Sequence, residues 1–330
     1  MGNFDIIAIG DITTDAFIRL KDASVNCDIN REHCMLSLRF GDKVPYEFVE
    51  IVRAVGNSAN TAVAGARLGL KTALVANTGD DDNGKECIAS LRESNVSTDF
   101  ISTQAGKHTN YHYVLWYEDE RTILIKHESF AYTLPDIGSP GWIYLSSMGE
   151  EAIPLYDLIP AYLDTHPGTR LAFQPGTYQI KLGSEKLAGI YAHTDTFFCN
   201  TEEAKRILKR EDFDIKMLLK GIRELGPKTV IITDGLKGAY ACHESDMWYM
   251  PVYPDPKPPY ERTGAGDAFS STVISALAMG KTVDEALRWA PINSMSVVGK
   301  IGAQAGLLSV SEIEGYLAQA PADYAPKKIS

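Results

Sequence analysis

Residues 261–280 read ERTGAGDAFSSTVISALAMG, a loop of small residues followed by an apolar, helix-like run. Gly264 and Gly266 flank Ala265 in this loop, and Asp267 follows directly. Small residues let backbone N–H groups come close to an anion, and the N-terminus of a helix carries about half a positive charge. The stretch therefore predicts a helix that begins near Gly266, with a carboxylate in its first turn behind an anion-binding loop.

Known phosphate loops do not fit this stretch. A Walker A loop needs a glycine where the chain has Ser275, and the GKT at residues 280–282 follows the end of a helix instead of opening one. A dinucleotide fingerprint fails because Phe269 stands where the third glycine is required. The H-R-D and D-F-G motifs of protein kinases are absent from the sequence. Taken alone, the loop is also explained as a simple helix start in which Asp267 is only a cap.

Strand-like and helix-like segments alternate along most of the chain. Residues 4–10 read FDIIAIG and predict a buried strand, and residues 57–69 predict a helix rich in small residues. Such alternation favours a doubly wound α/β core with a mostly parallel, Rossmann-like sheet. Residues 15–52 and 108–128 differ, because they hold short alternating pieces without a helical period. We expect them to form a small inserted β-sheet, and the core to consist of residues 1–14, 53–107 and 129–330.

Composition limits the class of protein. The net charge of −11 argues against nucleic acid or an anionic membrane as a partner. No apolar run reaches the roughly 20 residues that span a bilayer, and the N-terminus lacks a signal-peptide pattern, so we expect a cytoplasmic protein. The five cysteines include no C-x-x-C pair. They predict a reduced protein with structural cysteines, in preference to a disulfide scaffold or a metal site at Cys27, His33 and Cys34. The tail after Pro321 is expected to be loose.

Several stretches together resemble the ribokinase / phosphofructokinase-B (PfkB) family of carbohydrate and nucleoside kinases. Residues 54–98 and 261–280 are similar to its two signature regions, and NTEE at 200–203 is similar to its N-x-x-E motif. VIITDGLKGAY (230–240) resembles its nucleotide-side strand and turn, and NSMSVVGKIGAQAGL (293–307) resembles its closing helix and loop. The stretches occur in the family's order. The resemblance implies a ribokinase-like fold, in which a small β-sheet lid covers the acceptor site of the α/β core.

The resemblance also implies ATP-dependent phosphorylation of a hydroxyl group, with ATP and Mg²⁺ as cofactors. Asp267 would be the catalytic base, and the amides of Gly264, Ala265 and Gly266 would form an anion hole for the transferred phosphoryl group. Asn200 and Glu203 would organise Mg²⁺, through water, and the phosphates, although by themselves they also suit a helix capping box. The nucleotide side would further include Thr233, Gly235, Gly238 and Asn293. The acceptor side would include Asp15, Gly56, Asn57 and Asn60.

Some positions depart from the family's pattern. Glu261 and Arg262 replace its usual aspartate and threonine, which often help to hold a monovalent cation, so K⁺ activation does not carry over to this chain. Arg262 is a candidate for supplying positive charge near the phosphates. Val55 replaces the first glycine of a Gly-Gly pair and narrows the acceptor site. Asn57 stands where phosphofructokinase-type members often carry lysine, which argues against a phosphorylated sugar as acceptor.

The identity of the acceptor stays open. Asp15 and Asn60 suit vicinal hydroxyl groups, so a ribokinase- or fructokinase-like sugar kinase is the first hypothesis. A nucleoside (adenosine-like) kinase is the alternative, because aromatic residues of the inserted sheet can stack on a base, although we favour that they pack two lids in a homodimer. These residues are Phe40, Tyr46, Phe48, Tyr111, Tyr113, Trp116 and Tyr117. A non-catalytic sugar- or nucleotide-binding regulator would lack Asp267 or the glycine loop, and both are intact. Phe269 disfavours an NAD-linked oxidoreductase.

Overall fold

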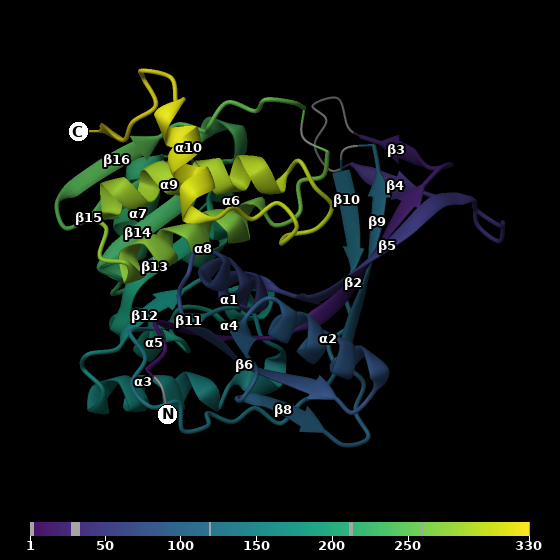
Figure 1. Ribbon diagram of the computed structural model, residues 1–330, viewed down its shortest axis with the longest axis horizontal. Helices are drawn as coiled ribbons and strands as arrows, with labels where there is room; N and C mark the ends of the chain where they lie inside the picture. Colours follow the sequence, from purple (N-terminus) through teal and green to yellow (C-terminus); the bar gives the residue numbers. More distant parts are fainter. Residues whose placement is uncertain (1–2, 28–33, 119, 211–213, 259, 330) are drawn as a thin grey trace.

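The computed structural model describes residues 3–27, 34–118, 120–210, 214–258 and 260–329. It has a large α/β body and a small sheet that projects from one side of this body (Figure 1). The chain leaves the first strand of the body, passes through the small sheet, and returns to the body. It enters the small sheet a second time before it completes the body.

The large sheet is doubly wound and mostly parallel, as the alternation predicted. Its strand order is β17-β16-β15-β14-β13-β12-β11-β1-β6-β7, and β8 also pairs with β6. Neighbours from β7 to β14 run parallel, whereas β15, β16 and β17 add antiparallel strands at one edge. The strands are β1 (Ile6–Ile9), β6 (Thr72–Gly79), β7 (Val96–Ser97), β8 (Ile101–Gln104), β11 (Trp142–Leu145), β12 (Arg170–Phe173), β13 (Thr194–Asn200), β14 (Thr229–Thr233), β15 (Ala239–His243), β16 (Asp246–Met250) and β17 (Lys327–Lys328).

Helices cover both faces of this sheet. Successive side chains of a strand point to opposite faces, and all four residues of β1 are buried because both faces are covered. Ile6 and Ala8 belong to the core formed with α1, α8, α9 and α10, while Ile7 and Ile9 belong to the core formed with α3, α5, α6 and α7. The helices are α1 (Asn57–Arg67), α2 (Asp82–Glu93), α3 (Leu155–Thr165), α4 (Thr177–Leu182), α5 (Ala188–His193), α6 (Thr201–Leu208), α7 (Ile215–Glu224), α8 (Ala265–Ala278), α9 (Val283–Val297) and α10 (Val310–Ala318), with 3₁₀ turns η1 (Glu150–Ala152) and η2 (Gly235–Lys237).

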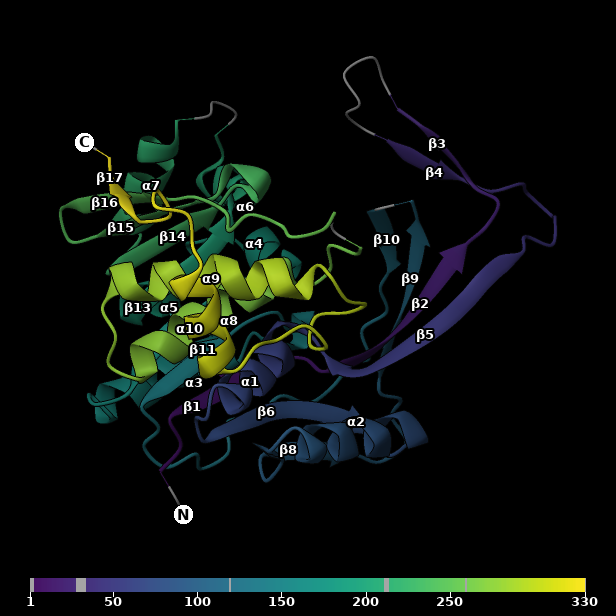
Figure 2. The same ribbon diagram turned by 45° about the horizontal axis from the view of Figure 1, so that its top comes forward.

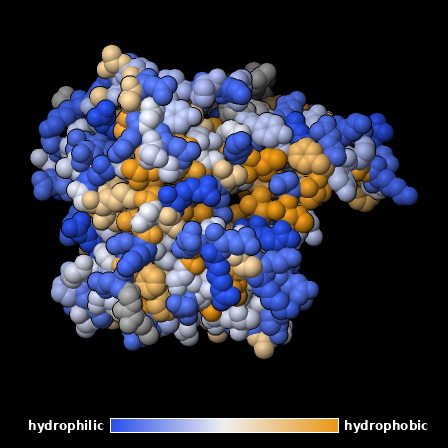
Figure 3. All heavy atoms as spheres, in the orientation of Figure 1, coloured by the Kyte–Doolittle hydropathy of each residue, from blue (hydrophilic) through white to orange (hydrophobic). Residues whose placement is uncertain are grey.

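The small sheet has the strand order β10-β9-β2-β5, and a separate β3–β4 hairpin lies beyond its far end (Figure 2). One face of the small sheet buries Phe17, Val114 and Trp116. The opposite face carries Val49, Ile51, Tyr113 and Leu124, which are exposed. The strands are β2 (Thr13–Leu20), β3 (Ser24–Asn26), β4 (Met35–Ser37), β5 (Tyr46–Val55), β9 (Asn110–Tyr117) and β10 (Glu120–Leu124). Figure 3 shows apolar side chains gathered over the small sheet and on the adjoining part of the body.

The winding of the large sheet reverses at β1, which lies between β6 and β11. In open α/β sheets, ligands bind outside the carboxyl ends of the strands near such a reversal. Asp11 follows β1 at this edge, Gln174 follows β12, and Asn200 ends β13. Only three residues separate the end of β1 from the first strand of the small sheet, so the small sheet starts at the same edge.

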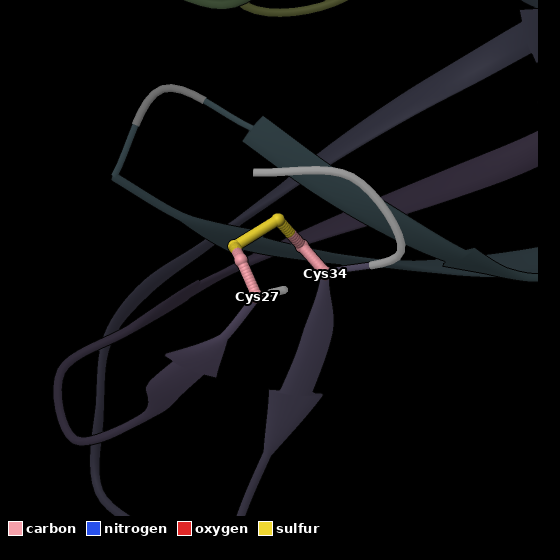
Figure 4. Close-up of a disulfide and its surroundings, with 2 residues drawn as sticks. All are labelled: Cys27 and Cys34. Atoms are coloured by element: carbon pink, nitrogen blue, oxygen red, sulfur yellow. A yellow bond between two sulfur atoms is a disulfide. The ribbon is translucent and has the colours of Figure 1, made fainter. Parts of the chain in front are cut away.

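The expectation of a fully reduced protein is wrong at one place. Cys27 and Cys34 form a disulfide between the end of β3 and the start of β4 (Figure 4). The hairpin pairs Asn26 with Met35 and brings the two cysteine Cα atoms to 4.0 Å, a proximity that a search for C-x-x-C spacing does not detect. His33 lies outside the described residues. Cys87, Cys199 and Cys242 are buried free thiols.

The expectation of a loose tail is also wrong. Lys327 and Lys328 pair with β16, and the amide of Ile329 donates to the carbonyl of Met247. Tyr324 is buried and donates its hydroxyl to the carbonyl of Arg288. An aromatic anchor among polar residues therefore holds this segment against the body. Within the described residues, no helix combines the length and the apolarity that a membrane crossing requires.

Candidate active site

The glycine loop meets α8 as predicted. Gly264 is the N-cap of α8 and has a positive φ of 83°, and a Cβ at this position would lie 2.4 Å from Ala303 Cα. Only glycine fits this turn without strain. A Cβ on Gly266 would have no atom within 4 Å, so its backbone borders open space. The first backbone N–H groups of a helix have no partner within the helix, so those of α8 are suited to bind an anion that enters this space.

Asp267 is held by three side-chain amides. Asn57 Nδ2 donates to Asp267 Oδ1 at 2.8 Å, and Asn60 Nδ2 donates to Oδ2 at 2.7 Å. Gln174 Nε2 donates to Oδ1 at 3.3 Å. Burial raises the pKa of Asp267, although these hydrogen bonds act in the opposite direction and the nearby charge of Asp15 raises it further. The result is a carboxylate with a fixed orientation and more basic than an exposed aspartate.

The amides that hold Asp267 are themselves oriented by neighbours. Gln304 Nε2 donates to Asn60 Oδ1 at 2.9 Å, which turns the amide nitrogen of Asn60 toward Asp267. Gln174 Oε1 accepts hydrogen bonds from Ser270 Oγ at 2.8 Å and from the Tyr144 hydroxyl, which turns its nitrogen in the same way. This supporting layer joins α1, β11, β12, α8 and the loop after α9 around one carboxylate.

The acceptor-side candidates lie next to Asp267. Asp15 is buried on β2, and its Oδ1 lies 3.4 Å from His112 Nδ1. Gly56 has a φ of 115°, and a Cβ there would meet the Asp11 carbonyl at 2.6 Å, so the turn before α1 requires glycine. Asn57 and Asn60 begin α1 and contact Asp267 as described above. The structure therefore brings the acceptor-side candidates together near the same carboxylate.

A second carboxylate on this side is Asp11, which the sequence analysis did not single out. It accepts hydrogen bonds from the Tyr132 hydroxyl at 2.6 Å and the Gly149 amide at 2.8 Å, and its Oδ2 lies 3.1 Å from His127 Nδ1. The ring of His127 lies edge-on to His112 and to Tyr178. Aromatic rings therefore stand beside the two acidic groups.

Three of the nucleotide-side candidates border a largely apolar cavity of about 260 Å³ that is also lined by the start of α8. Thr233, Gly235 and Gly238 line one side. Ala265 and Gly266 also line it, together with the polar residues Asp255, Arg262 and Ser294. The other lining residues are Leu236, Ala239, Pro251, Val252, Tyr253, Phe269, Pro291, Met295 and Val298. Such a cavity suits a flat base whose attached phosphates reach the helix N-terminus.

Asn293 lies beside this cavity, within the core. It is fully buried, donates to Thr272 Oγ1 at 2.8 Å, and accepts from the Leu308 amide at 2.9 Å. The next two residues, Ser294 and Met295, line the cavity. Asn293 therefore fixes the packing of α9 against α8 and the following loop.

Asn200 and Glu203 form the capping box that their spacing predicted. Asn200 Oδ1 accepts from the Glu203 amide, and Glu203 Oε2 accepts from the Asn200 amide, both at 2.8 Å. Burial raises the pKa of Glu203, and the charge of Asp267 adds to this rise, so the two carboxylates interact. Their oxygen atoms are the ligand type that Mg²⁺ prefers. The described residues contain no cluster of three or more His, Cys, Asp and Glu side chains that could hold a metal, so a bound Mg²⁺ would also need water and phosphate oxygens.

Comparisons with known proteins show the family of the chain. The model of the pfkB family of carbohydrate kinases matches residues 50–309. Ribokinase from Bacillus subtilis is 28% identical over 272 residues, covering 79% of this chain and 87% of that protein. A nucleoside kinase from Methanothermobacter thermautotrophicus is 25% identical over 260 residues, covering 78% and 82%. The bifunctional protein HldE of Sulfurimonas denitrificans is 25% identical over 332 residues, but the chain spans only 64% of its length.

Solved structures give the same fold. Ribokinase from Giardia lamblia superposes with a TM-score of 0.80 at 19% identity, covering 96% of this chain and 99% of that one. Arabidopsis thaliana ribokinase complexed with ribose and ATP has a TM-score of 0.78 at 18% identity, covering 96% and 99%. The ribokinase-like fold expected from the resemblance is confirmed. The match to the family model over most of its length shows that this chain belongs to the pfkB family of carbohydrate kinases, phosphotransferases with an alcohol group as acceptor.

Proposed function

We propose that this chain transfers the γ-phosphoryl group of ATP to a hydroxyl group of a small sugar, with Asp267 as the base. The observation that supports this most strongly is the position of Asp267. Three amides orient its carboxylate, and the start of its helix also lines the largely apolar cavity. A hydroxyl group bound near Asn57 and Asn60 would thus lie between the base and the end of that cavity.

The residues divide the work of phosphoryl transfer. ATP, when bound, supplies the phosphoryl group, and Mg²⁺ neutralises part of the phosphate charge. The amides of Gly264, Ala265 and Gly266 bind the oxygen atoms of the group in transfer, where each such donor is worth about 3 kcal/mol. Asp267 accepts the proton of the acceptor hydroxyl as the new P–O bond forms. Asn200 and Glu203 orient Mg²⁺ through water, and K⁺ is not required.

The acceptor binds between the body and the small sheet, which serves as a lid. In this proposal residues 15–52 and 108–128 form the lid, and residues 1–14, 53–107 and 129–330 form the core. Asp15 accepts hydrogen bonds from vicinal hydroxyl groups of the sugar. A closed lid excludes water, which would otherwise compete as acceptor.

A nucleoside is the second candidate acceptor. It is favoured by the edge-on rings of His112, His127 and Tyr178, of which His112 lies beside Asp15 and His127 beside Asp11, because these rings offer apolar surface to a base. One relative is a nucleoside kinase. Several aromatic residues of the inserted sheet do not favour it, because Phe40, Tyr46 and Tyr113 are exposed.

The lid also serves as a dimer interface in this proposal. Val49, Ile51, Tyr113 and Leu124 form an exposed apolar face on the side of the sheet that buries none of the body's core. Exposed apolar patches of this kind mark contacts with other chains. We place the protein in the cytoplasm because ATP is its donor. The Cys27–Cys34 disulfide argues against this location, because the cytosol keeps thiols reduced.

A screen tests the function. The protein is incubated with Mg-ATP and a panel of pentoses, hexoses, keto-deoxy acids and nucleosides, with and without K⁺, and ADP release is measured. We expect ADP release with one sugar, at the same rate with and without K⁺. Release only with a nucleoside would select the second candidate. Tight binding of one compound without ADP release would indicate a non-catalytic regulator and contradict the proposal.

A further inference from the structure

The segment before the glycine loop is tied to the small sheet by an ion pair. Glu261 is 1% exposed, and its Oε1 lies 3.7 Å from Nε of Arg121 on β10. The two residues belong to different parts of the fold, since Arg121 lies in the small sheet and Glu261 lies three residues before the N-cap of α8. Arg121 is partly exposed, with 28% of its side chain accessible.

The Glu261 carboxylate organises the turn that opens the glycine loop. Its Oε1 accepts hydrogen bonds from the Thr263 amide at 2.7 Å and from Thr263 Oγ1 at 2.5 Å. The amides of Tyr260 and Glu261 both donate to the carbonyl of Val298 at the end of α9. Thr263 directly precedes Gly264, the N-cap of α8. The orientation of the first backbone amides of α8 therefore depends on the position of the Glu261 carboxylate.

A carboxylate in this position needs a compensating positive charge. Its second oxygen, Oε2, is buried and has no hydrogen-bond partner among the described residues. Burying an ionised carboxylate is costly unless an opposite charge stands beside it. Arg121 supplies that charge. Glu120 Oε2 lies 3.5 Å from Arg121 Nη1, and Glu120 Oε1 lies 3.9 Å from Arg262 Nε. A second acid therefore links the two arginines.

A ring contact reinforces the same junction. Trp116 on β9 is directly opposite Arg121 in the strand register, and its ring lies edge-on to Tyr260 with the ring centres 5.0 Å apart. Trp116 is buried, so the contact is part of a packed interface. Two adjacent side chains of the small sheet thus contact the two residues that lead into the glycine loop.

We infer that Arg121 is a positioning residue for phosphoryl transfer: by neutralising Glu261 from the lid, it holds the glycine loop in its anion-binding conformation. The inference rests on the proposed function, because it assigns the loop as the anion hole. If Arg121 has this role, the conformation of the glycine loop depends on the position of the lid, which also covers the acceptor. A lid that closes over its acceptor would therefore also complete the anion hole.

Hydrogen–deuterium exchange tests this without any need for turnover. In Arg121→Met, the buried charge of Glu261 is no longer compensated, and we expect the Thr263 amide to exchange about tenfold faster than in the parent. In the double variant Arg121→Met/Glu261→Gln, both charges are gone, and exchange should return close to the parent rate. Arg53→Met is the matched control. It breaks another ion pair where the small sheet joins the body, from Arg53 Nε near the end of β5 to Glu86 Oε2 on α2 at 2.6 Å, and should leave the exchange of Thr263 unchanged.

Kinetics supply the second arm. With the acceptor found in the screen, Arg121→Met should lower kcat about tenfold, while the KM values for ATP and for the acceptor stay within about twofold of the parent. The kcat of Arg121→Lys should lie between those of Arg121→Met and the parent. The double variant should recover part of the lost kcat. Unchanged Thr263 exchange in Arg121→Met, or a double variant as impaired as the single one, would overturn the inference. The failure of the proposed function would appear separately, as a parent protein without turnover whose exchange pattern still responds to Arg121→Met.

Discussion

Asn57 donates a 2.8 Å hydrogen bond to Asp267, joining the first residue of α1 to the first turn of α8 across 210 positions of sequence. Asn60 reaches the other oxygen of the same carboxylate from the next turn of α1. The start of one helix thus positions the acid at the start of another. The amides of the glycine loop and the groups beside the acceptor therefore keep a fixed geometry with respect to a single proton acceptor.

The pH dependence of turnover should report this environment. Because burial raises the pKa of Asp267, the base becomes protonated at a higher pH than an ordinary aspartate, and kcat should fall as pH drops through that raised value. Asn60→Ala removes a hydrogen bond that favours the ionised form, so the pKa rises further and the acid limb of kcat moves to higher pH. Profiles of the parent, Asn60→Ala and the control Asn83→Ala on α2 would check this. An acid limb that stays in place in Asn60→Ala would show that Asp267 is not the titrating base.

The two glycines of the loop should respond differently to alanine. Gly264→Ala places a Cβ 2.4 Å from Ala303 Cα at a positive φ, and should destabilise the protein by about 2 kcal/mol. Gly266→Ala meets no protein atom within 4 Å, so its stability should stay near that of the parent. The added methyl group would occupy the space proposed for the transferred phosphoryl group, and kcat/KM for ATP should fall about tenfold or more. Thermal melting and steady-state kinetics separate the two effects, and a Gly266→Ala enzyme with parent kinetics would contradict the proposed anion hole.

Removing the disulfide should affect only the tip of the small sheet. The variant Cys27→Ser/Cys34→Ser frees the ends of β3 and β4, which pair with each other and not with the four-stranded sheet. We expect faster amide exchange in Ser24–Asn26 and Met35–Ser37, with kcat unchanged. A marked loss of turnover would mean that the hairpin takes part in the reaction.

The exposed face of the small sheet should control the oligomeric state. Ile51 is 43% exposed on β5, and Ile51→Asp should convert a dimer into a monomer because it places a charge in an apolar contact. Leu158 on α3 is 47% exposed but lies on the body, so Leu158→Asp is the matched control. Light scattering at micromolar concentration distinguishes the states. A monomeric parent would refute the interface.

Local patterns predicted much of this structure, and long-range contacts account for what they missed. The alternation of strands and helices predicted the parallel core, and the spacing of Asn200 and Glu203 predicted their capping box. Asp267 was predicted in the first turn of its helix, because the glycines before it mark the helix start.

Other residues of the site gave weaker signals. Gln174 and Asp11 follow buried strands, and their position at the carboxyl ends of those strands is a signal that could have found them. His112 and His127 stand in segments without a motif, whereas Gln304 lies in the stretch 293–307 but was not singled out there. All three reach the site only because the small sheet and the loop after α9 fold over it. The Arg121–Glu261 pair has the same origin, since the two charges lie 140 positions apart in the sequence and become neighbours only through tertiary packing.

The most direct test of the account is the turnover of Asp267→Asn with Mg-ATP and the acceptor found in the screen. The substitution keeps the size of the side chain but removes the proton acceptor. We predict that kcat falls about a thousandfold while ATP binding, measured by calorimetry, stays within a few-fold of the parent. An Asp267→Asn enzyme that phosphorylates the acceptor at the parent rate would contradict the central claim.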